Sequence, residues 1–204
     1  MPHSTEQEAF WAGSFGAEYT RRNADESTLA SYTAMWSRIL GRTAAIGSAL
    51  ELGCNAGLNL RALQRLLPGV DLHAVEINPV AVEEARKTGA NVVEGSILEF
   101  QPPRPFDLVL ICGVLIHIDP DSLGTVYELM HAASARYICL SEYFNPTPVE
   151  IPYRGHRDRL FKRDFAGELL DRYDDLRLVD YGFVYDRDPA FPQDNTTWFL
   201  LERR

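Results

Sequence analysis

The sequence predicts an α/β fold, in which N-terminal helices precede a doubly wound sheet of seven strands that is mostly parallel with an antiparallel last strand. From Ser48 onward, short apolar runs alternate with helical segments, as in βαβ units whose parallel sheet is buried on both faces. Residues 108–111 are moreover too uniformly apolar for a sheet edge. Because 204 residues suit one domain, we expect a single domain at 1–204, with a helical cap at 1–47 and the sheet core at 48–204.

The boundaries of the expected elements follow from glycine, proline and apolar spacing. Apolar and aromatic residues at helical spacing predict two or more helices within residues 1–47. Gly53 and Gly57 break the first strand, Pro68 ends the next helix, and Pro79 suits the first position of the helix after it. The expected strands are 48–52, 70–77, 91–94, 106–114, 136–142, 176–186 and 196–202, and the expected helices are 58–67, 80–87, 119–131 and 162–173. We expect the third and fourth strands at or near the centre of the sheet.

Composition excludes several classes of protein. Apolar residues make up 46% of the chain and charged residues 24%, as in globular proteins. The net charge of −9 opposes binding to nucleic acid or to anionic membranes. No apolar run is long enough to span a bilayer and the start lacks a leader pattern, so we expect a cytoplasmic protein. The isolated Cys54, Cys112 and Cys139 lie in apolar contexts, which predicts core residues and no disulfide, zinc or other metal site.

A nucleotide-binding arrangement begins at the first strand. The strand, the glycine-rich turn and the helix are followed by Glu76, which ends the second strand 23 residues after Gly53, close to the ~20 expected for an acid that binds a ribose. Asn55 occupies the position where a dinucleotide site needs glycine beside the pyrophosphate. Glu51 would repel a pyrophosphate but suits a ligand with an ammonium group and a sulfonium. Both residues favour S-adenosylmethionine over NAD.

With these motifs the chain resembles the class I S-adenosylmethionine-dependent methyltransferases, which have a Rossmann-like fold. The resemblance runs from Leu50 onward, without the usual central glycine at Asn55, and its motifs are residues 51–57, 75–78, 94–97 and 106–118. A narrower resemblance links the chain to the pseudaminic acid biosynthesis-associated methylases, through residues 15–23, 141–149, 153–156, 161–167 and 191–194. It implies a small, polar, anionic acceptor.

The wider resemblance also implies the cofactor contacts. Glu76 would hold the ribose hydroxyls with Ile77 beside it, although a solvated acid at a strand end is the alternative. Residues 19–23 resemble a segment that folds over the cofactor in related enzymes, where an arginine pairs with the methionine carboxylate; an ordinary helix end is the alternative. The cofactor-binding residues expected in this way are Tyr19, Arg22, Glu51, Gly53, Asn55, Glu76, Ile77, Ser96, Ile97, Cys112 and Gly113.

Candidates for the chemistry lie at the ends of strands and in one long loop. His117 and Glu142 follow the fourth strand and end the fifth, so each is either a base or a local structural residue. The loop at 145–161 is long enough to be functional or mobile, and it holds His156 as a further base candidate.

The acceptor contacts are expected in the same region. Arg154 and Arg157 suit a carboxylate or phosphate on the acceptor, unless they form only local ion pairs. Tyr143 is either a π face for the sulfonium or a packing residue. Tyr153 and Gln193 complete the expected acceptor-binding set.

The sequence therefore predicts transfer of a methyl group from S-adenosylmethionine to oxygen or nitrogen of a small, polar, anionic acceptor, namely a sugar, an amino acid or a natural-product intermediate. One alternative is a non-catalytic partner or regulatory protein that binds S-adenosylmethionine, and another is an NAD-dependent oxidoreductase. We expect a monomer or homodimer without nucleic-acid or membrane partners.

Overall fold

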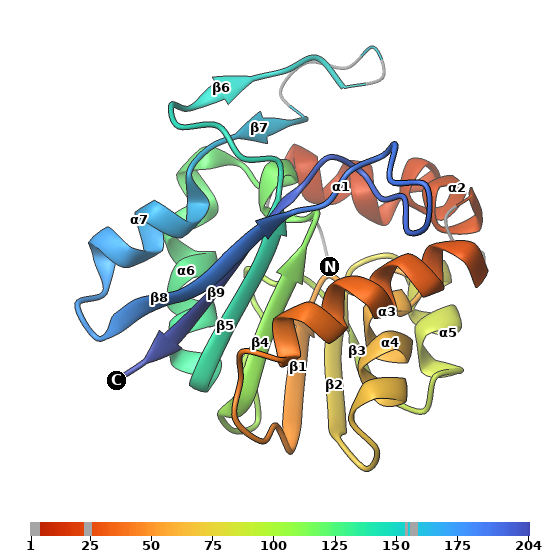
Figure 1. Cartoon of the computed structure of the whole chain (residues 1–204). Helices are drawn as coiled ribbons and strands as arrows, with labels where there is room; N and C mark the ends of the chain where they lie inside the picture. The colour runs from red at the N-terminus through yellow and green to blue at the C-terminus, as the bar shows by residue number, and fades with distance from the viewer. Residues whose placement is uncertain (1–4, 23–25, 154, 156–158) are drawn as a thin grey trace.

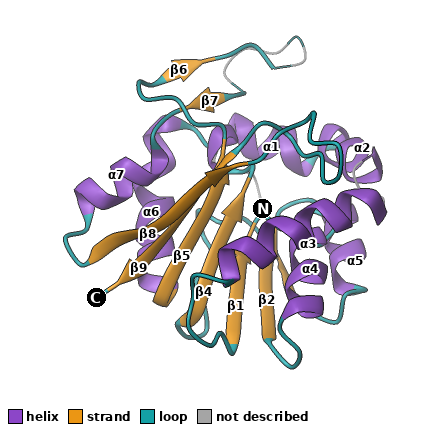
Figure 2. Cartoon of the chain, viewed as in Figure 1, coloured by secondary structure: helices purple, strands orange, loops and turns teal. Residues whose placement is uncertain are grey.

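The protein folds around one large sheet. The computed structural model describes residues 5–22, 26–153, 155 and 159–204. They form a seven-stranded sheet in the order β3-β2-β1-β4-β5-β9-β8 (Figure 2), which confirms the predicted fold class. β9 runs antiparallel to β5 and β8, and the other neighbours pair in parallel. The strands are β1 (Ser48–Leu52), β2 (Asp71–Glu76), β3 (Asn91–Glu94), β4 (Phe106–Cys112), β5 (Ser134–Glu142), β8 (Leu176–Phe183) and β9 (Thr197–Arg203).

Helices cover both faces of the sheet (Figure 1). One face packs on α3 (Glu26–Leu40), α4 (Leu58–Leu66) and α5 (Pro79–Arg86), and the other on α6 (Leu123–Ala133) and α7 (Phe165–Arg172). Alternate residues of a strand point to opposite faces, so Leu108 and Leu110 of β4 join the α3 side while Val109 and Ile111 join the α6 side. β4 is buried on both faces because it lies in the middle of the sheet.

The remaining elements gather at the edge where the parallel strands end. Figure 1 shows α1 (Glu6–Ala12) and α2 (Ser14–Arg22) lying across this edge. A small hairpin of β6 (Val149–Glu150) and β7 (Phe161–Lys162) projects beyond it. Two short 3-10 helices, η1 (Leu115–His117) and η2 (Pro120–Ser122), follow β4. The expected cap at 1–47 thus has two parts, because α3 packs on the sheet while α1 and α2 lie over its edge.

Asn78 shows how local sequence starts a helix and attaches the N-terminal segment. Its side-chain oxygen accepts hydrogen bonds from the backbone N–H of Val80 and Ala81, and Pro79 occupies the first turn of α5. Its Nδ2 donates to the carbonyl oxygens of Trp11 at 2.8 Å and Gly13 at 3.1 Å. One buried side chain therefore joins α5 to the junction of α1 and α2.

The expected position of the third strand is wrong. β3 lies at an edge of the sheet, and Val92 is its single buried residue. The chain winds outward from β1 through β2 to β3, so β3 has β2 as its one neighbour among the described strands. The fourth strand, β4, lies between β1 and β5 as expected.

Two further expected boundaries shift. The helix expected from residue 162 begins at Phe165, because Phe161 and Lys162 pair with β6 and Asp164 caps the helix. The loop expected at 145–161 accordingly contains one strand of a hairpin. None of the described helices is long and apolar enough to cross a membrane.

Candidate active site

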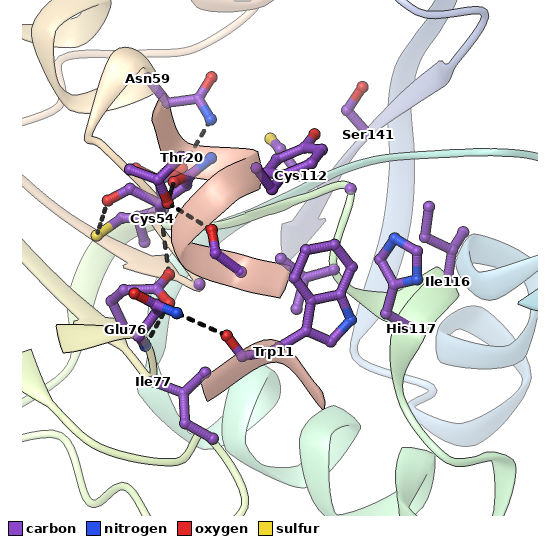
Figure 3. A pocket seen from close by; sticks show the side chains of 18 of the residues that line it. Trp11, Thr20, Cys54, Asn59, Glu76, Ile77, Cys112, Ile116, His117 and Ser141 are labelled. Carbon is purple, nitrogen blue, oxygen red and sulfur yellow. Dashed lines mark hydrogen bonds between the residues drawn. The ribbon is translucent and has the colours of Figure 1, made fainter. Parts of the chain in front are cut away.

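A cavity of about 610 Å³ opens at the edge where the parallel strands end. Its wall comes from the ends of β1, β2, β4 and β5, from α1 to α3, and from the segment between β8 and β9. This volume suits a small-molecule ligand, since such sites typically measure roughly 300–1,000 Å³. Figure 3 shows the Trp11 indole between the Glu76 side of the cavity and His117.

The glycine-rich turn after β1 adopts a left-handed backbone at three positions. The φ angles are 77° at Gly53, 46° at Asn55 and 78° at Gly57. A side chain at Gly53 would also come within 2.7 Å of Val114. Asparagine is among the residues that tolerate this conformation best after glycine, which explains how Asn55 replaces the glycine usual in such turns. Its backbone N–H points at Glu76 and donates to Oε2 at 2.8 Å.

Glu76 is anchored at the end of β2 through both carboxylate oxygens. Oε2 accepts from the Asn55 backbone and Oε1 from the Asn78 backbone at 2.8 Å. Burial raises the pKa of Glu76, and the backbone N–H groups of Asn78, Asn55 and Ile77 oppose that rise. Each oxygen keeps a second lone pair, and both Glu76 and Ile77 line the cavity. The carboxylate can therefore accept two further hydrogen bonds from a ligand.

Glu51 carries a carboxylate oxygen without a partner. The side chain is 1% exposed, Oε1 accepts from Asn59 Nδ2 at 2.7 Å, and Oε2 has no hydrogen-bond partner among the described residues. Burial raises the pKa of Glu51 to about 8, with the Asn59 hydrogen bond lowering it and nearby Glu76 raising it further. Because Glu51 lines the cavity, a cationic ligand group can satisfy this oxygen.

The side of the cavity near β3 and β4 is largely apolar. Gly95, Ile97 and Leu98 line it, and so do Cys112 and Gly113. Ser96 is absent from this lining: its hydroxyl bonds the Glu8 carboxylate and accepts from the Leu98 backbone at 2.9 Å. Of the expected pair at 96 and 97, Ile97 thus faces the cavity and Ser96 attaches α1. The three cysteines are free thiols; Cys54 and Cys139 are buried, and Cys112 is partly exposed at the wall.

The N-terminal helices lie close to the glycine-rich turn. The Thr20 hydroxyl lies 2.7 Å from Asn55 Oδ1, which links α2 to the glycine-rich turn. Gly16 permits close packing of α2 on α1, since a Cβ there would lie 1.9 Å from the Trp11 carbonyl oxygen. Tyr19 lines the cavity as expected, whereas Arg22 is exposed and lies outside the lining.

His117 is a buried, neutral imidazole on the wall opposite the glycine-rich turn. Nδ1 lies 2.5 Å from the Arg159 carbonyl oxygen, which can only accept, so Nδ1–H donates this hydrogen bond and the lone pair is on Nε2. Burial lowers the pKa of His117 to about 4, with the Arg159 hydrogen bond opposing the shift. The ring centroid lies 4.6 Å from that of Trp11 and 5.1 Å from that of Tyr153. His117 can therefore accept a proton or a hydrogen bond at neutral pH.

Glu142 lies outside the cavity lining. Its carboxylate accepts from the backbone N–H groups of Val114 and Leu115 at 3.0 Å and of Ile116 at 3.5 Å. Burial raises the pKa of Glu142 to about 8, and these backbone donors oppose the rise. These contacts hold the η1 turn, and the role of Glu142 as a base stays a prediction.

Three of the expected acceptor residues lie in the cavity lining, namely Tyr143, Tyr153 and Gln193. Burial raises the pKa of Tyr143, and Asp194 raises it further and forms a hydrogen bond with it. Gln193 Nε2 donates to the Ser31 carbonyl oxygen at 2.8 Å, which joins the segment between β8 and β9 to α3. The other expected residues of the long loop, Arg154, His156 and Arg157, lie outside the described residues.

Several cavity residues were not predicted from the sequence. Glu8, Trp11, Thr20, Tyr32 and Asn59 line the cavity, yet they belong to helices whose spacing indicates packing alone. The carboxylates on the described lining are Glu8, Glu51, Glu76, Asp119, Asp186 and Asp194, with no lysine or arginine among the described lining residues. Over the described part of the chain, no three His, Cys, Asp or Glu residues cluster in a way that could hold a metal ion.

The family model described as "Methyltransferase domain" matches residues 50–135. None of the curated proteins matches the sequence.

Solved structures share the fold over nearly the whole chain. One is the 1,6-didemethyltoxoflavin-N1-methyltransferase of Burkholderia thailandensis, solved with bound 1,6-didemethyltoxoflavin and S-adenosylhomocysteine. Its TM-score is 0.72 at 21% identity, and the alignment covers 100% of this chain and 92% of that chain. The magnesium protoporphyrin IX methyltransferase of Synechocystis, with bound S-adenosylhomocysteine, has a TM-score of 0.69 at 15% identity and covers 97% and 98%. The glycopeptide N-methyltransferase MtfA, with S-adenosylmethionine, has a TM-score of 0.63 at 15% identity and covers 87% and 94%.

The two kinds of comparison agree on the fold and on a methyltransferase-like segment. The chain matches the methyltransferase domain model over residues 50–135 and shares the fold of solved methyltransferases. Its methyltransferase domain match begins at Leu50 in β1 and ends in β5, so it spans β1 to β4 and the helices between them.

Proposed function

We propose that this protein transfers a methyl group from S-adenosylmethionine to an oxygen or nitrogen of a small polar acceptor. One observation carries the proposal: two buried carboxylates face one cavity. Both oxygens of Glu76 are anchored, and one oxygen of Glu51 has no partner among the residues that the structure describes. They match the two polar ends of the cofactor, a ribose with two hydroxyls and an amino acid with an ammonium group.

The residues that would hold the cofactor follow from this match. Glu76 accepts from the ribose hydroxyls, and Glu51 Oε2 accepts from the ammonium group. Ile97 and Leu98 offer an apolar surface for the adenine. Trp11 and Tyr19 cover the cavity from the N-terminal helices, which excludes water from the site.

His117 is the group we propose for handling the acceptor's proton. S-adenosylmethionine, when bound, would supply the methyl group from its sulfonium; the sulfur–methyl bond breaks, and the neutral thioether that remains needs no acid. A lone pair on the oxygen or nitrogen of the methyl acceptor forms the new bond to the methyl carbon. His117 Nε2 takes up the proton that this hydroxyl or amine loses. The low pKa keeps the imidazole unprotonated at neutral pH, so it is ready to accept. Most of the rate can come from alignment of the two reactants, so proton transfer to His117 supplies the smaller part.

The acceptor is proposed as a sugar, an amino acid or a natural-product intermediate. The pseudaminic acid biosynthesis-associated resemblance supports a small polar acceptor, and Arg154 and Arg157 support an anionic one. Two proteins with a similar fold are a 1,6-didemethyltoxoflavin-N1-methyltransferase and a glycopeptide N-methyltransferase, which supports a natural-product intermediate as the acceptor. If the arginines bind the acceptor, Arg154→Ala raises the KM for the acceptor and leaves cofactor affinity unchanged.

Two measurements test the function. Isothermal titration with S-adenosylhomocysteine and with NADH should give binding of the first alone. The protein is then incubated with S-adenosylmethionine and a panel of uronic acids, amino sugars, amino acids and phenolic acids, and S-adenosylhomocysteine release is followed by mass spectrometry. Release above the acceptor-free rate supports the enzyme. Binding without release on any acceptor favours the non-catalytic partner, and no binding at all refutes the proposal.

A further inference from the structure

A chain of two hydrogen bonds runs from the N-terminal helices to the cofactor side of the cavity. Trp36 Nε1 in α3 donates to Asn59 Oδ1 in α4 at 2.8 Å, and Asn59 Nδ2 donates to Glu51 Oε1 in β1 at 2.7 Å. Trp36 is 0%, Asn59 6% and Glu51 1% exposed. Three separate elements thus meet in a polar chain that is buried within an apolar layer.

The chemistry of the three groups gives this chain one direction. An indole N–H can only donate, so it holds the Asn59 carbonyl oxygen toward Trp36 and the amide N–H2 toward Glu51. Glu51 Oε1 must then accept, and Oε2 has no hydrogen-bond partner within the described part of the chain, where Glu51 lines the cavity. An unpaired, buried carboxylate oxygen is unfavourable unless a ligand completes it.

We propose that Trp36 and Asn59 are positioning residues: they hold the Glu51 carboxylate so that its free oxygen receives the ammonium group of the cofactor's amino-acid end. The proposal rests on the proposed function, because it requires that the cavity binds S-adenosylmethionine. It assigns a role in cofactor binding to two residues of α3 and α4 that are buried in the layer on one face of the sheet.

The titratable groups around Glu51 fit a cationic ligand. Those that interact with it electrostatically are Glu76 of β2, Tyr32 of α3, Cys54 after β1 and Cys112 of β4. None of these groups is a cation, so none can neutralise Glu51 in place of the ligand. Asn59 contributes a neutral donor, which orients the carboxylate without cancelling its charge.

The test compares two ligands that differ in the amino-acid end. S-adenosylhomocysteine carries the ammonium group, whereas 5′-methylthioadenosine keeps the adenine, ribose and sulfur but lacks it. Isothermal titration of both ligands into Asn59→Leu should show a loss of about tenfold or more for S-adenosylhomocysteine, the scale of a hydrogen bond to a charged group, and less than twofold for 5′-methylthioadenosine. Trp36→Phe should shift the two ligands in the same unequal way.

Two controls show whether the effect passes through Glu51. Trp198→Phe removes an indole from the same buried layer without touching this chain of hydrogen bonds, and it should leave both affinities unchanged. In a Glu51→Gln background, Asn59→Leu should cause no further loss for S-adenosylhomocysteine. Melting curves establish that each variant is folded, and Trp36→Phe serves if Asn59→Leu is not.

Each outcome supports or overturns the proposal. An equal loss for both ligands, or a further loss in the Glu51→Gln background, would mean that Asn59 supports the structure in general and does not position Glu51. Unchanged affinities in Asn59→Leu and Trp36→Phe would also overturn it. If the unmodified protein binds neither ligand, the proposed function fails first and takes this inference with it.

Discussion

Glu76→Gln tests the cofactor site most directly. The substitution keeps the size of the side chain but replaces one carboxylate oxygen by an N–H2 group and removes the charge. In the unmodified protein, both carboxylate oxygens of Glu76 accept from backbone N–H groups, one from that of Asn55 and the other from that of Asn78. A glutamine can accept from one of them alone, so the other donor loses its partner and one ribose hydroxyl loses a charged acceptor.

The expected magnitude follows from that single lost acceptor. A hydrogen bond to a charged group contributes about 1.5–3 kcal/mol, so the affinity for S-adenosylhomocysteine should fall by about 10- to 150-fold. Isothermal titration measures it. Glu94→Gln is the matched control, because Glu94 pairs with Glu76 across β2 and β3 but is exposed and lies outside the cavity lining.

An analogue of S-adenosylhomocysteine without the ribose 3′-hydroxyl separates binding from folding. The original protein should bind this analogue more weakly than S-adenosylhomocysteine, and the Glu76→Gln variant should discriminate less between the two. If Glu76→Gln leaves the affinity unchanged, or discriminates as strongly as the original protein, Glu76 does not hold the ribose and the cofactor must bind in another way.

Three further predictions follow from the same cavity. The pKa of His117 is about 4 in the folded state and 6.5 ordinarily, so the folded protein should lose stability as the pH drops from neutral toward pH 4. Urea unfolding should show that the free energy of unfolding falls by about 2–3 kcal/mol over this range, and His117→Gln should lack this loss. Glu51, with a pKa of about 8, binds the ammonium group as a carboxylate. Affinity for S-adenosylhomocysteine should therefore rise by about tenfold or more between about pH 6 and about pH 8, while that for 5′-methylthioadenosine stays flat in the same titration. Gly16→Ala brings a Cβ to 1.9 Å from a backbone oxygen, so α2 must move; faster release of S-adenosylhomocysteine in stopped-flow measurements is expected, and an unchanged rate would show that α2 does not cover the bound cofactor.

The central sheet was predictable because its signals are local. Glycine and proline bound the strands, and strands buried on both faces are apolar throughout, as β1 and β4 are. The edge position of β3 was missed because strand order depends on which way each crossover turns, and the short run 91–94 contains no signal for that. Glu76 was found for a related reason, since the end of a strand fixes where a side chain emerges.

The acceptor side was harder to predict. Glu142 ends a strand just as Glu76 does, and its role in holding the η1 turn depends on the backbone of residues 114–116, which lies far away in the sequence. Ser96 likewise bonds Glu8, 88 residues earlier in the chain. Such partners follow from packing and leave no pattern in the sequence.

By itself, the sequence determined the succession of the main strands and helices along the chain, the turn after β1 and the acid that ends β2. These features were predictable because backbone preference and apolar spacing are encoded over a few neighbouring residues. Asn55 shows the limit of that local code: its identity is compatible with a left-handed turn, but its bond to Thr20 depends on where α2 lies. Only the tertiary structure decided that Trp36 and Asn59 reach Glu51, and that His117 is buried, neutral and held by the Arg159 carbonyl. Burial sets the pKa of a side chain and orients its hydrogen bonds, and burial exists only once distant segments have packed together.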